Sequence, residues 1–349
     1  MPADRLIHPL QAPTAEVMER AVLQVLGGNP LPDVAAHLRM DPTELDTAVG
    51  VFRCGGRDAL CQRASARWWQ VYVEFTEWET AESYAVDHLA PLLRRWEAEQ
   101  DITGWWFIRK YPCWRLRLRP RGPQSPARIR AALDDLVNAG RIRRWWTGIY
   151  EPETAAFGGH VGIAIAHNLF HADSRAVLDL STRDHTTIGR RELSILLCTA
   201  LMRGAGLEWY EQGDVWDRVR HERPTPPDVT PERLRPMVNA LQTLLLADTA
   251  PDGLMFGPDG PLKFAATWAT ASDQAGRDLR AAVRNGTLER GLRRILSYLV
   301  IFHWNRLGLS GRDQSALSWA ARTAILDAPT PNHDGPGGNL PQAPPEAVG

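Results

Sequence analysis

Apolar and polar residues alternate with a period of two between residues 115 and 119. Leu116 and Leu118 alternate there with Arg115, Arg117 and Arg119. This pattern is typical of a β-strand with one buried face and one polar face, so we expect the three guanidinium groups on the same face. A row of guanidiniums, each with five N–H donors, suits the binding of an anion. The alternative is a solvent-exposed strand face whose arginines form ion pairs.

The alternating stretch belongs to a longer pattern of strands and helices. Strands are expected at 70–75, 105–108, 114–119 and 143–150, and helices at 80–99 and 126–139. The resulting order of strand, helix, strand, strand, helix, strand is that of the ferredoxin-like arrangement. Trp105, Trp106 and Trp114 flank the arginines, which favours a peptide-binding surface or an aromatic-walled cleft.

The rest of the chain repeats its apolar residues at helical intervals. Helices are expected at 162–180, 190–204, 214–220, 230–247, 287–307 and 313–326. The predicted fold class is therefore α+β, with an antiparallel ferredoxin-like sheet segment and a large helical part. We expect a helical module at 1–64, a second domain at 65–327, and a Pro/Gly-rich tail at 328–349 that should be disordered.

The N-terminal module has the pattern of a helix-turn-helix. Helices at 14–26 and 32–38 precede a tight turn and a third helix, for which Asp41 is the expected N-cap and Pro42 the first residue. Glu44 and Asp46 stand in the first turn of this third helix, where they would repel phosphates. Docking on a protein partner or a peptide is therefore favoured over DNA reading.

The composition argues against several classes of protein. The 349 residues carry a formal net charge of −1, whereas bulk nucleic-acid binding relies on a strongly basic surface. No apolar run approaches the about 18 residues of a membrane span, and the first ten residues lack the apolar core of a signal peptide. The four cysteines form no CxxC pair and have no zinc-ligand spacing. We expect a cytoplasmic protein without metal or other cofactor, membrane or DNA.

A loop is expected after the last predicted strand. It contains Tyr150, Glu151 and Glu153, and the proline between the two glutamates prevents the strand from continuing. Gly158 and Gly159 follow, and glycines allow positive φ and the close approach of another chain segment. A functional loop and a plain turn both fit this pattern.

Two clusters of polar residues lie in the predicted helices. His167 and His171 share a helix face close to Asp173, but the metalloprotease pattern would require a Glu after the first His. A hydrogen-bonded helix face is therefore favoured over a metal site. Glu211 and Asp214 are interpreted as partners in structural ion pairs with arginines.

His303 is the best candidate for acid–base chemistry. Three leucines precede it by eleven, seven and four residues, so it should face the protein interior with them. Asn305 and Arg306 follow within one turn. An inward histidine beside an arginine suits proton transfer, and a hydrogen-bonded core histidine fits the same spacing equally well.

Five blocks of these residues carry a family resemblance. In order they are WWFIRKYPCWRLRLR, IYEPETAAFGG, HNLFHADSR, LEWYEQGDVW and FHWNRLG, between residues 68 and 326. Together they resemble the thiopeptide-type bacteriocin biosynthesis proteins, which are similar to the C-terminal elimination domain of class I lantibiotic dehydratases. The resemblance implies work on ribosomally made peptides. In the dehydratases one component glutamylates Ser or Thr with glutamyl-tRNA, and the elimination component removes glutamate to leave a dehydroamino acid.

The resemblance also implies roles for individual residues. The family pattern PHxRLR matches residues 112–117, with Cys113 at the place of its His, and a His before NRL matches His303. Arg115, Arg117 and His303 are therefore the expected catalytic residues. The expected substrate-binding residues are Arg119, Trp114, Tyr150, Glu151, Glu153, Asn305 and Arg306. No metal or cofactor is implied.

The resemblance leaves the reaction open between two family branches. Elimination would require a separate glutamyl-tRNA-dependent protein to glutamylate the precursor peptide, and the N-terminal module is reminiscent of split dehydratase partners. A related branch joins two dehydroalanines by a formal [4+2] cycloaddition to form the pyridine of thiopeptides. Pro152, which stands where fused dehydratases have a third arginine, mildly favours that branch. A third interpretation is a non-catalytic partner that binds the precursor peptide, and a homodimer is left open.

Overall fold

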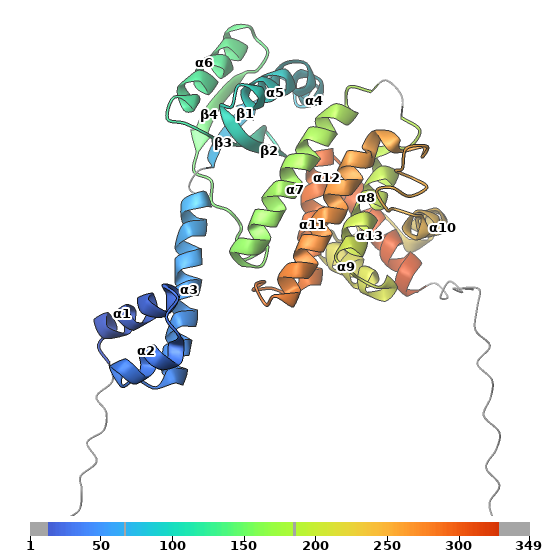
Figure 1. The fold of residues 1–349 in the computed structure, drawn as a ribbon. Coiled ribbons are helices and arrows are strands. Elements are labelled where there is room, and N and C mark those ends of the chain that lie inside the picture. The colour runs from blue at the N-terminus through green and yellow to red at the C-terminus, as the bar shows by residue number, and fades with distance from the viewer. Residues whose placement is uncertain (1–12, 66–67, 184–185, 328–349) are drawn as a thin grey trace, which may run out of the picture. The chain divides into compact units, whose positions relative to one another are not determined.

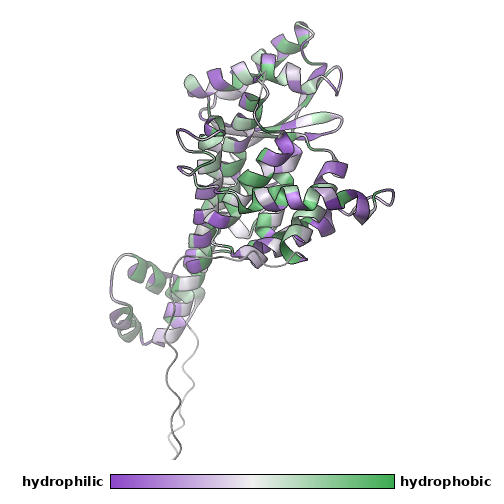
Figure 2. Cartoon of the chain, turned by 90° about the vertical axis from the view of Figure 1, so that its right-hand side faces the viewer, coloured by the Kyte–Doolittle hydropathy of each residue, from purple (hydrophilic) through white to green (hydrophobic). Residues whose placement is uncertain are grey.

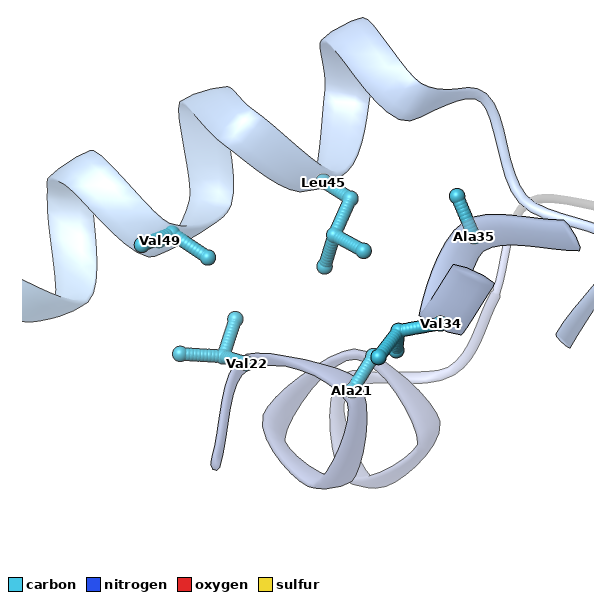
Figure 3. Packing of buried hydrophobic residues seen from close by; sticks show 6 residues of the cluster. All are labelled: Ala21, Val22, Val34, Ala35, Leu45 and Val49. Atoms are coloured by element: carbon cyan, nitrogen blue, oxygen red, sulfur yellow. The ribbon is translucent and has the colours of Figure 1, made fainter. Parts of the chain in front are cut away.

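Three helices form the N-terminal part of the chain, in the predicted order. The computed structural model describes residues 13–65, 68–183 and 186–327. The helices are α1 (Ala15–Leu26), α2 (Leu31–Leu38) and α3 (Pro42–Ser65). Asp41 caps α3 as predicted, because its Oδ1 accepts the backbone N–H of Thr43 at 2.8 Å. Their small shared core, shown in Figure 3, consists of Ala21, Val22, Val34, Ala35, Leu45 and Val49.

Four strands follow and form one sheet. They are β1 (Trp69–Glu74), β2 (Ile102–Lys110), β3 (Cys113–Pro120) and β4 (Arg144–Gly148). Their order in the sheet is β2-β3-β1-β4 (Figure 1), and β1 pairs antiparallel with β4, with Gln70 opposite Gly148. This order places the first and last strands side by side, so the predicted ferredoxin-like arrangement is confirmed.

The two faces of the sheet differ in polarity. Val71, Val73, Leu116 and Leu118 are fully buried on one face. Helix α6 (Ser125–Asn138) packs against this face, where its Asp134 accepts the indole N–H of Trp145 at 2.9 Å. The predicted helix at 80–99 contains three segments, namely α4 (Ala81–Tyr84), the π-helix η1 (Ala85–Leu89) and α5 (Ala90–Ala98).

Helices make up the remainder of the described chain. They are α7 (Gly159–Leu180), α8 (Arg190–Gly204), α9 (Trp209–Glu222), α10 (Pro231–Leu246), the 3₁₀ turn η2 (Lys263–Ala265), α11 (Ala266–Arg284), α12 (Leu292–Leu307) and α13 (Gly311–Leu326). The α+β class is confirmed. In Figure 2 the inner helices of this bundle are largely green, for hydrophobic residues, while purple hydrophilic residues gather on the outer turns.

Helix α11 is absent from the sequence-based prediction. Its buried side is made mostly of small residues, including Ala269, Ser272 and Ala275, which give a weak hydrophobic signal. Small residues serve close packing here. A Cβ atom on Gly276 would lie 2.2 Å from the backbone oxygen of Leu201 in α8, so the two helices approach closely at this point.

Helix α12 is surrounded by other helices. It packs against α7, α8, α9 and α11, and its buried residues point in all directions around the helix axis. A helix that is buried all round belongs to the core of a domain. The polar residues that it carries into this core include His303 and Arg306, which are 8% and 0% exposed.

The described chain forms two compact units. The first contains α1–α3, β1, α6, β4, most of α5, residues 102–105 of β2 and residues 115–120 of β3, and the second contains α4, η1, the β2–β3 turn with its flanking residues, and α7–α13. The boundary expected between 1–64 and 65–327 stays a prediction, and the tail at 328–349 lies outside the described residues. Among the described helices, none combines the length and the apolar composition that a transmembrane span requires.

A half-buried carboxylate, Glu82 of α4, joins several elements of the second unit. It forms ion pairs with Arg109, at 2.6 Å, and with Arg190, and it accepts the hydroxyl of Ser181. Burial alone would raise the pKa of Glu82, but the two arginines and the serine outweigh it and lower the pKa to about 2. The ends of β2, α7 and α8 are thus held on one carboxylate.

Candidate functional site

The polar face of β3 carries the predicted row of arginines, each with its guanidinium over an aromatic ring of the first unit. The distances from Cζ to the ring centroid are 5.7 Å for Arg115 over Tyr72, 5.4 Å for Arg117 over Tyr150 and 5.5 Å for Arg119 over Trp68. We call these three arginines and three rings the arginine face. Stacking fixes the plane of a guanidinium while its N–H donors point outward along the edge.

The three arginines differ in their hydrogen bonds. Arg119 donates from Nε and Nη2 to the side chain and carbonyl of Thr103 on β2, at 2.6 and 3.0 Å. Arg117 is 7% exposed and donates from Nη1 to the carbonyl of Arg115 at 3.0 Å. The buried Nε of Arg115 has no hydrogen-bond partner among the described residues. Arg119 is thus held by a neighbouring strand, whereas Arg115 keeps a donor for another acceptor.

The two glycines in the loop after β4 have the positive φ angles predicted for them. Gly158 and Gly159 have φ angles of +80° and +90°. The backbone N–H of Glu289 donates to the carbonyl of Gly158 at 3.0 Å, and a Cβ atom on Gly159 would lie 2.4 Å from the Glu289 carboxylate. The close approach of another segment is therefore confirmed. Glu151 and Glu153 are exposed.

A buried hydrogen-bond network in the second unit centres on Asp173 of α7. Its Oδ1 accepts the indole N–H of Trp268 from α11 at 2.8 Å and lies 2.8 Å from Nδ1 of His303 on α12. Its Oδ2 accepts the Nε–H of Arg306, also on α12, at 2.5 Å. Three helices therefore bring polar side chains together at one carboxylate, and α7 lies far from α11 and α12 in the sequence. We call these four residues the Asp173 network.

The hydrogen bonds within this network orient the ring of His303. Burial alone would raise the pKa of the Asp173 carboxyl, but the charges and hydrogen bonds of His303 and Arg306 outweigh it and lower the pKa. The carboxylate is thus ionised, so the facing Nδ1 of His303 carries a proton. The other ring nitrogen, Nε2, is buried and has no hydrogen-bond partner among the described residues.

His303 also borders a small cavity. The cavity has room for about one water molecule and is lined by Leu169, Asp173, Leu197, Cys198, Leu201, Ser272, Leu299 and His303. Burial raises the pKa of the Cys198 thiol well above its usual range, so this cysteine is a neutral neighbour. An imidazole with a carboxylate on Nδ1 and an unpaired Nε2 is the arrangement of a general base.

The two polar clusters predicted in the helices turn out differently. Asp173, which the sequence grouped with His167 and His171, is bonded instead to residues of α11 and α12. His167 is buried with its ring 5.9 Å from that of Trp106. Among the described residues, no group of three or more His, Cys, Asp or Glu side chains has the geometry to hold a metal ion.

Glu211 and Asp214 form ion pairs as interpreted, both of them with Arg293. The distances between the charged atoms are 2.8 Å for Glu211 and 2.5 Å for Asp214. Glu211 also belongs to a capping box with Glu208 at the start of α9. Both acidic residues therefore join α9 to the first turn of α12.

Three of the expected substrate-binding residues are occupied by neighbours in the second unit. Trp114 is buried and stacks on Phe107 at 4.5 Å. Asn305 accepts an amide N–H of Gln314 at 3.0 Å. Arg306 has no exposed surface and stacks on Phe170 at 4.3 Å. Their contacts in this structure are with the protein itself.

The predicted site residues thus fall into two sets. Arg115, Arg117, Arg119, Tyr150 and Glu151 belong to the first unit, and Trp114, Glu153, His303, Asn305 and Arg306 to the second. Sequence reasoning missed Asp173 as the partner of His303. A signal existed, because Asp173 follows the buried Phe170 and precedes the buried Val177 on the inner face of α7, and a carboxylate at such a position requires partners.

A family profile matches most of the chain. The sequence profile described as lantibiotic biosynthesis dehydratase C-term matches residues 68–325. This range agrees with the extent of the resemblance found in the sequence blocks. Among curated proteins, no relative matches the chain.

Two solved structures share the fold. The tRNA-dependent lantibiotic dehydratase MibB from Microbispora sp. 107891 superimposes with a TM-score of 0.53 at 22% identity, over 76% of this chain and 28% of that protein. The pyridine synthase TbtD from thiomuracin biosynthesis superimposes with a TM-score of 0.55 at 14% identity, over 75% of this chain and 98% of that one. At these identities the likeness concerns the fold alone, and the chain matches only 28% of the length of MibB.

Proposed function

Because the chain belongs to the family of lantibiotic biosynthesis dehydratase C-terminal domains, we propose that it modifies a ribosomally made peptide by eliminating glutamate from glutamylated Ser or Thr. The product is dehydroalanine or dehydrobutyrine. The observation that carries this proposal is the Asp173–His303 pair, with its buried and unpaired Nε2. β-Elimination needs a base for the Cα proton, and an imidazole whose Nδ1 is held by a carboxylate can supply one at Nε2.

In the proposed reaction, His303 Nε2 takes the Cα proton of the glutamylated residue. The electrons of the C–H bond form the new Cα=Cβ double bond, and the Cβ–O bond breaks to release glutamate as a carboxylate. Asp173 orients the imidazole and stabilises the imidazolium that forms. Arg306 neutralises Asp173 and has its Nε on that carboxylate, so we assign it a positioning role.

Negative charge develops at two places during elimination, on the amide oxygen next to Cα and on the departing glutamate. Arg115 and Arg117 are the proposed groups that stabilise this charge, since preorganised cations act most strongly where charge develops in the transition state. Tyr150 and Arg119 support this row, and Trp114, Glu151, Glu153 and Asn305 stay proposed contacts of the peptide. The proposal places the protein in the cytoplasm, where a glutamyl-tRNA-dependent protein would glutamylate the precursor.

A second candidate reaction is the formal [4+2] cycloaddition of two dehydroalanines to form a pyridine. Pro152 favours it, because it stands where fused dehydratases have a third arginine. Cycloaddition relies on the orientation of two reacting groups and on a proton shuttle, and it needs less basicity than elimination does.

Mass spectrometry of peptides incubated with the purified protein tests the proposal. Loss of glutamate from a glutamylated Ser/Thr peptide, with formation of the dehydroamino acid, is the expected result. Release of the leader from a peptide that already carries two dehydroalanines would establish pyridine formation instead. Tight binding of both peptides without any change in mass would establish a non-catalytic, peptide-binding partner.

A further inference from the structure

A second group of arginines lines a groove on the helical unit. The groove is bordered by α9, the end of α11 and the start of α12. Six arginines line it, against one acidic residue, Glu211. They are Arg218, Arg280, Arg284, Arg290, Arg293 and Arg294, and we call their surface the arginine groove. It belongs to neither the arginine face nor the Asp173 network.

Four of these six arginines have no charged partner among the described residues. Arg293 is paired with acidic residues of α9, and Arg294 lies 3.9 Å from Glu222. Arg218, Arg280, Arg284 and Arg290, by contrast, form no ion pair within the described part of the chain. Since the whole protein has a net charge of −1, the positive charge of the groove is a local concentration.

The local structure makes this concentration costly without an anion. The first turn of α12 carries Arg293 and Arg294 and no acidic residue, although the positive end of a helix dipole favours acidic side chains. A Cβ atom on Gly206, which has a φ of +78°, would lie 2.8 Å from Nε of Arg280. The glycine thus gives this guanidinium room to lie beside the groove wall. Repulsion among the arginines would be relieved by a bound carboxylate or phosphate.

The surroundings of the groove distinguish between these two anions. The adjoining hollow shares Arg218 and Arg294 with the groove and is also lined by Asp214, Asp217 and Glu222, which would repel a continuous phosphate backbone. The groove itself has apolar lining residues, among them Leu207 and Val283, the latter 46% exposed. A surface of arginines around apolar side chains suits a short peptide with both acidic and apolar residues.

We propose that the arginine groove binds an acidic segment of the peptide substrate. This inference rests on the proposed function, because that function makes a peptide the substrate. Along α12, His303 follows Leu292 of the groove by eleven residues, which corresponds to about 16 Å of helix. An extended peptide covers this distance with about five residues, so the acidic segment should lie at least that far from the residue that reacts.

Fluorescence anisotropy tests the groove directly. The probe is a fluorescein-labelled synthetic peptide of alternating Glu and Leu, titrated with the full-length protein. The variant Arg218→Gln/Arg280→Gln/Arg284→Gln should bind it at least about tenfold more weakly than the wild type. The control Arg53→Gln/Arg233→Gln/Arg235→Gln removes the same charge from exposed positions elsewhere and should bind like the wild type. Equal affinity of all three proteins would overturn the proposal.

Two further titrations guard against a folding defect and a different ligand. With wild-type protein alone, a probe with Gln in place of Glu should bind at least about tenfold more weakly than the acidic probe, and equal binding would overturn the proposal. Labelled single-stranded RNA should show no loss of affinity specific to the groove variant. If RNA binds through the three arginines and the acidic peptide does not, the groove is a nucleic-acid site and the proposal fails.

An activity measurement separates this inference from the proposed elimination. The groove variant should convert a short glutamylated peptide at the wild-type kcat, and should show a KM raised at least about tenfold only for a peptide extended by the acidic segment. Equal KM values for the extended peptide would contradict the groove assignment. If the wild type eliminates from neither peptide, the proposed function fails, and the anisotropy comparison still decides whether the groove binds acidic peptides.

Discussion

The Asp173 network and the arginine face are two ways of holding charge. In the network, one buried carboxylate receives three donors from Trp268, His303 and Arg306. On the arginine face, three cations of one strand are held over aromatic rings. The oxygens of Asp173 are satisfied within the network, and His303 Nε2 is a ring nitrogen of the network that has no partner among the described residues. The arginine face, in contrast, presents a row of like charges.

The difference follows from the elements that carry the residues. Three packed helices meet at an interior point, so their polar residues must satisfy one another there. Alternate residues of a strand all project to one side, so a strand builds a row with a regular repeat. Helices thus suit a single preorganised base, and the sheet suits a surface for negative charge.

The largest effect is expected from Asp173→Asn. The change leaves Arg306 as a buried charge without its carboxylate, which should cost roughly 3–5 kcal/mol of unfolding free energy. Elimination should fall by about 10²–10⁴-fold, because His303 loses the carboxylate that holds its Nδ1. Urea unfolding and the yield of dehydroalanine measure the two effects.

A double variant separates stability from catalysis in this network. Adding Arg306→Met removes the buried charge, so Asp173→Asn/Arg306→Met should recover much of the lost stability. It should not recover elimination. Recovery of both together would mean that Asp173 acts on the fold alone.

Arg117→Ala should distinguish the contribution of the arginine face to elimination from that of the Asp173 network. The variant loses one charge-stabilising group, so elimination should fall by about 10²–10³-fold. Its free energy of unfolding should fall by about 1–2 kcal/mol, because the variant loses both the cation–π contact with Tyr150 and the hydrogen bond to the carbonyl of Arg115. Steady-state elimination and thermal unfolding check this, and an unchanged dehydration yield would remove Arg117 from the reaction.

The contacts of Glu82 with Arg109, Arg190 and Ser181 form a carboxylate network without a histidine, and Glu82→Gln removes its carboxylate. The pKa of Glu82 falls from 4.5 to about 2 on folding, which corresponds to at most about 3 kcal/mol of stability at neutral pH, reduced by solvent screening at this partly exposed site. Because the folded-state pKa is the lower one, this stability is complete above about pH 4.5 and is lost as the pH falls toward 2.

The Gln variant should therefore be destabilised at pH 7 and should show a flatter loss of stability in acid. Denaturant unfolding between pH 2 and pH 7 measures both effects. Per folded molecule, elimination should equal that of the wild type. A large catalytic defect in this variant would show that any ion-paired carboxylate of the unit matters, and would weaken the special role of Asp173.

The smallest effect is expected from Tyr150→Leu. The guanidinium of Arg117 would lose the ring beneath it, a contact that contributes about 0.5–1 kcal/mol at such a site. Elimination should fall by about two- to fivefold, since 1.4 kcal/mol corresponds to a factor of about ten. Tyr150→Phe keeps the ring and should retain the wild-type rate. Equal rates for Leu and Phe would mean that stacking does not position Arg117.

Much of the fold could be predicted from local patterns. The period of two at 115–119 predicted β3, and the Asp-Pro pair at 41–42 predicted the start of α3, because strand alternation and helix caps are local properties. Helix α11 escaped prediction for a physical reason. Its packing depends on Ala, Ser and Gly residues that permit close contact with α8, and such residues give little hydrophobic signal in the sequence.

The site could be predicted only in part. The leucine spacing placed His303 on a buried face, which the structure confirms. Its partner Asp173 lies 130 residues earlier in the chain, and no local pattern links two residues at that separation. The burial of Arg306 likewise depends on Asp173 and Phe170 of α7, so sequence alone assigned it to the substrate.

The most direct test of the account is the conversion of a glutamylated Ser peptide by wild-type protein and by His303→Ala, followed by mass spectrometry at equal amounts of folded protein. The account predicts that the wild type releases glutamate and forms dehydroalanine, while the variant stays folded and leaves the glutamylated peptide intact. Equal yields of dehydroalanine from the two proteins would show that His303 is not the base.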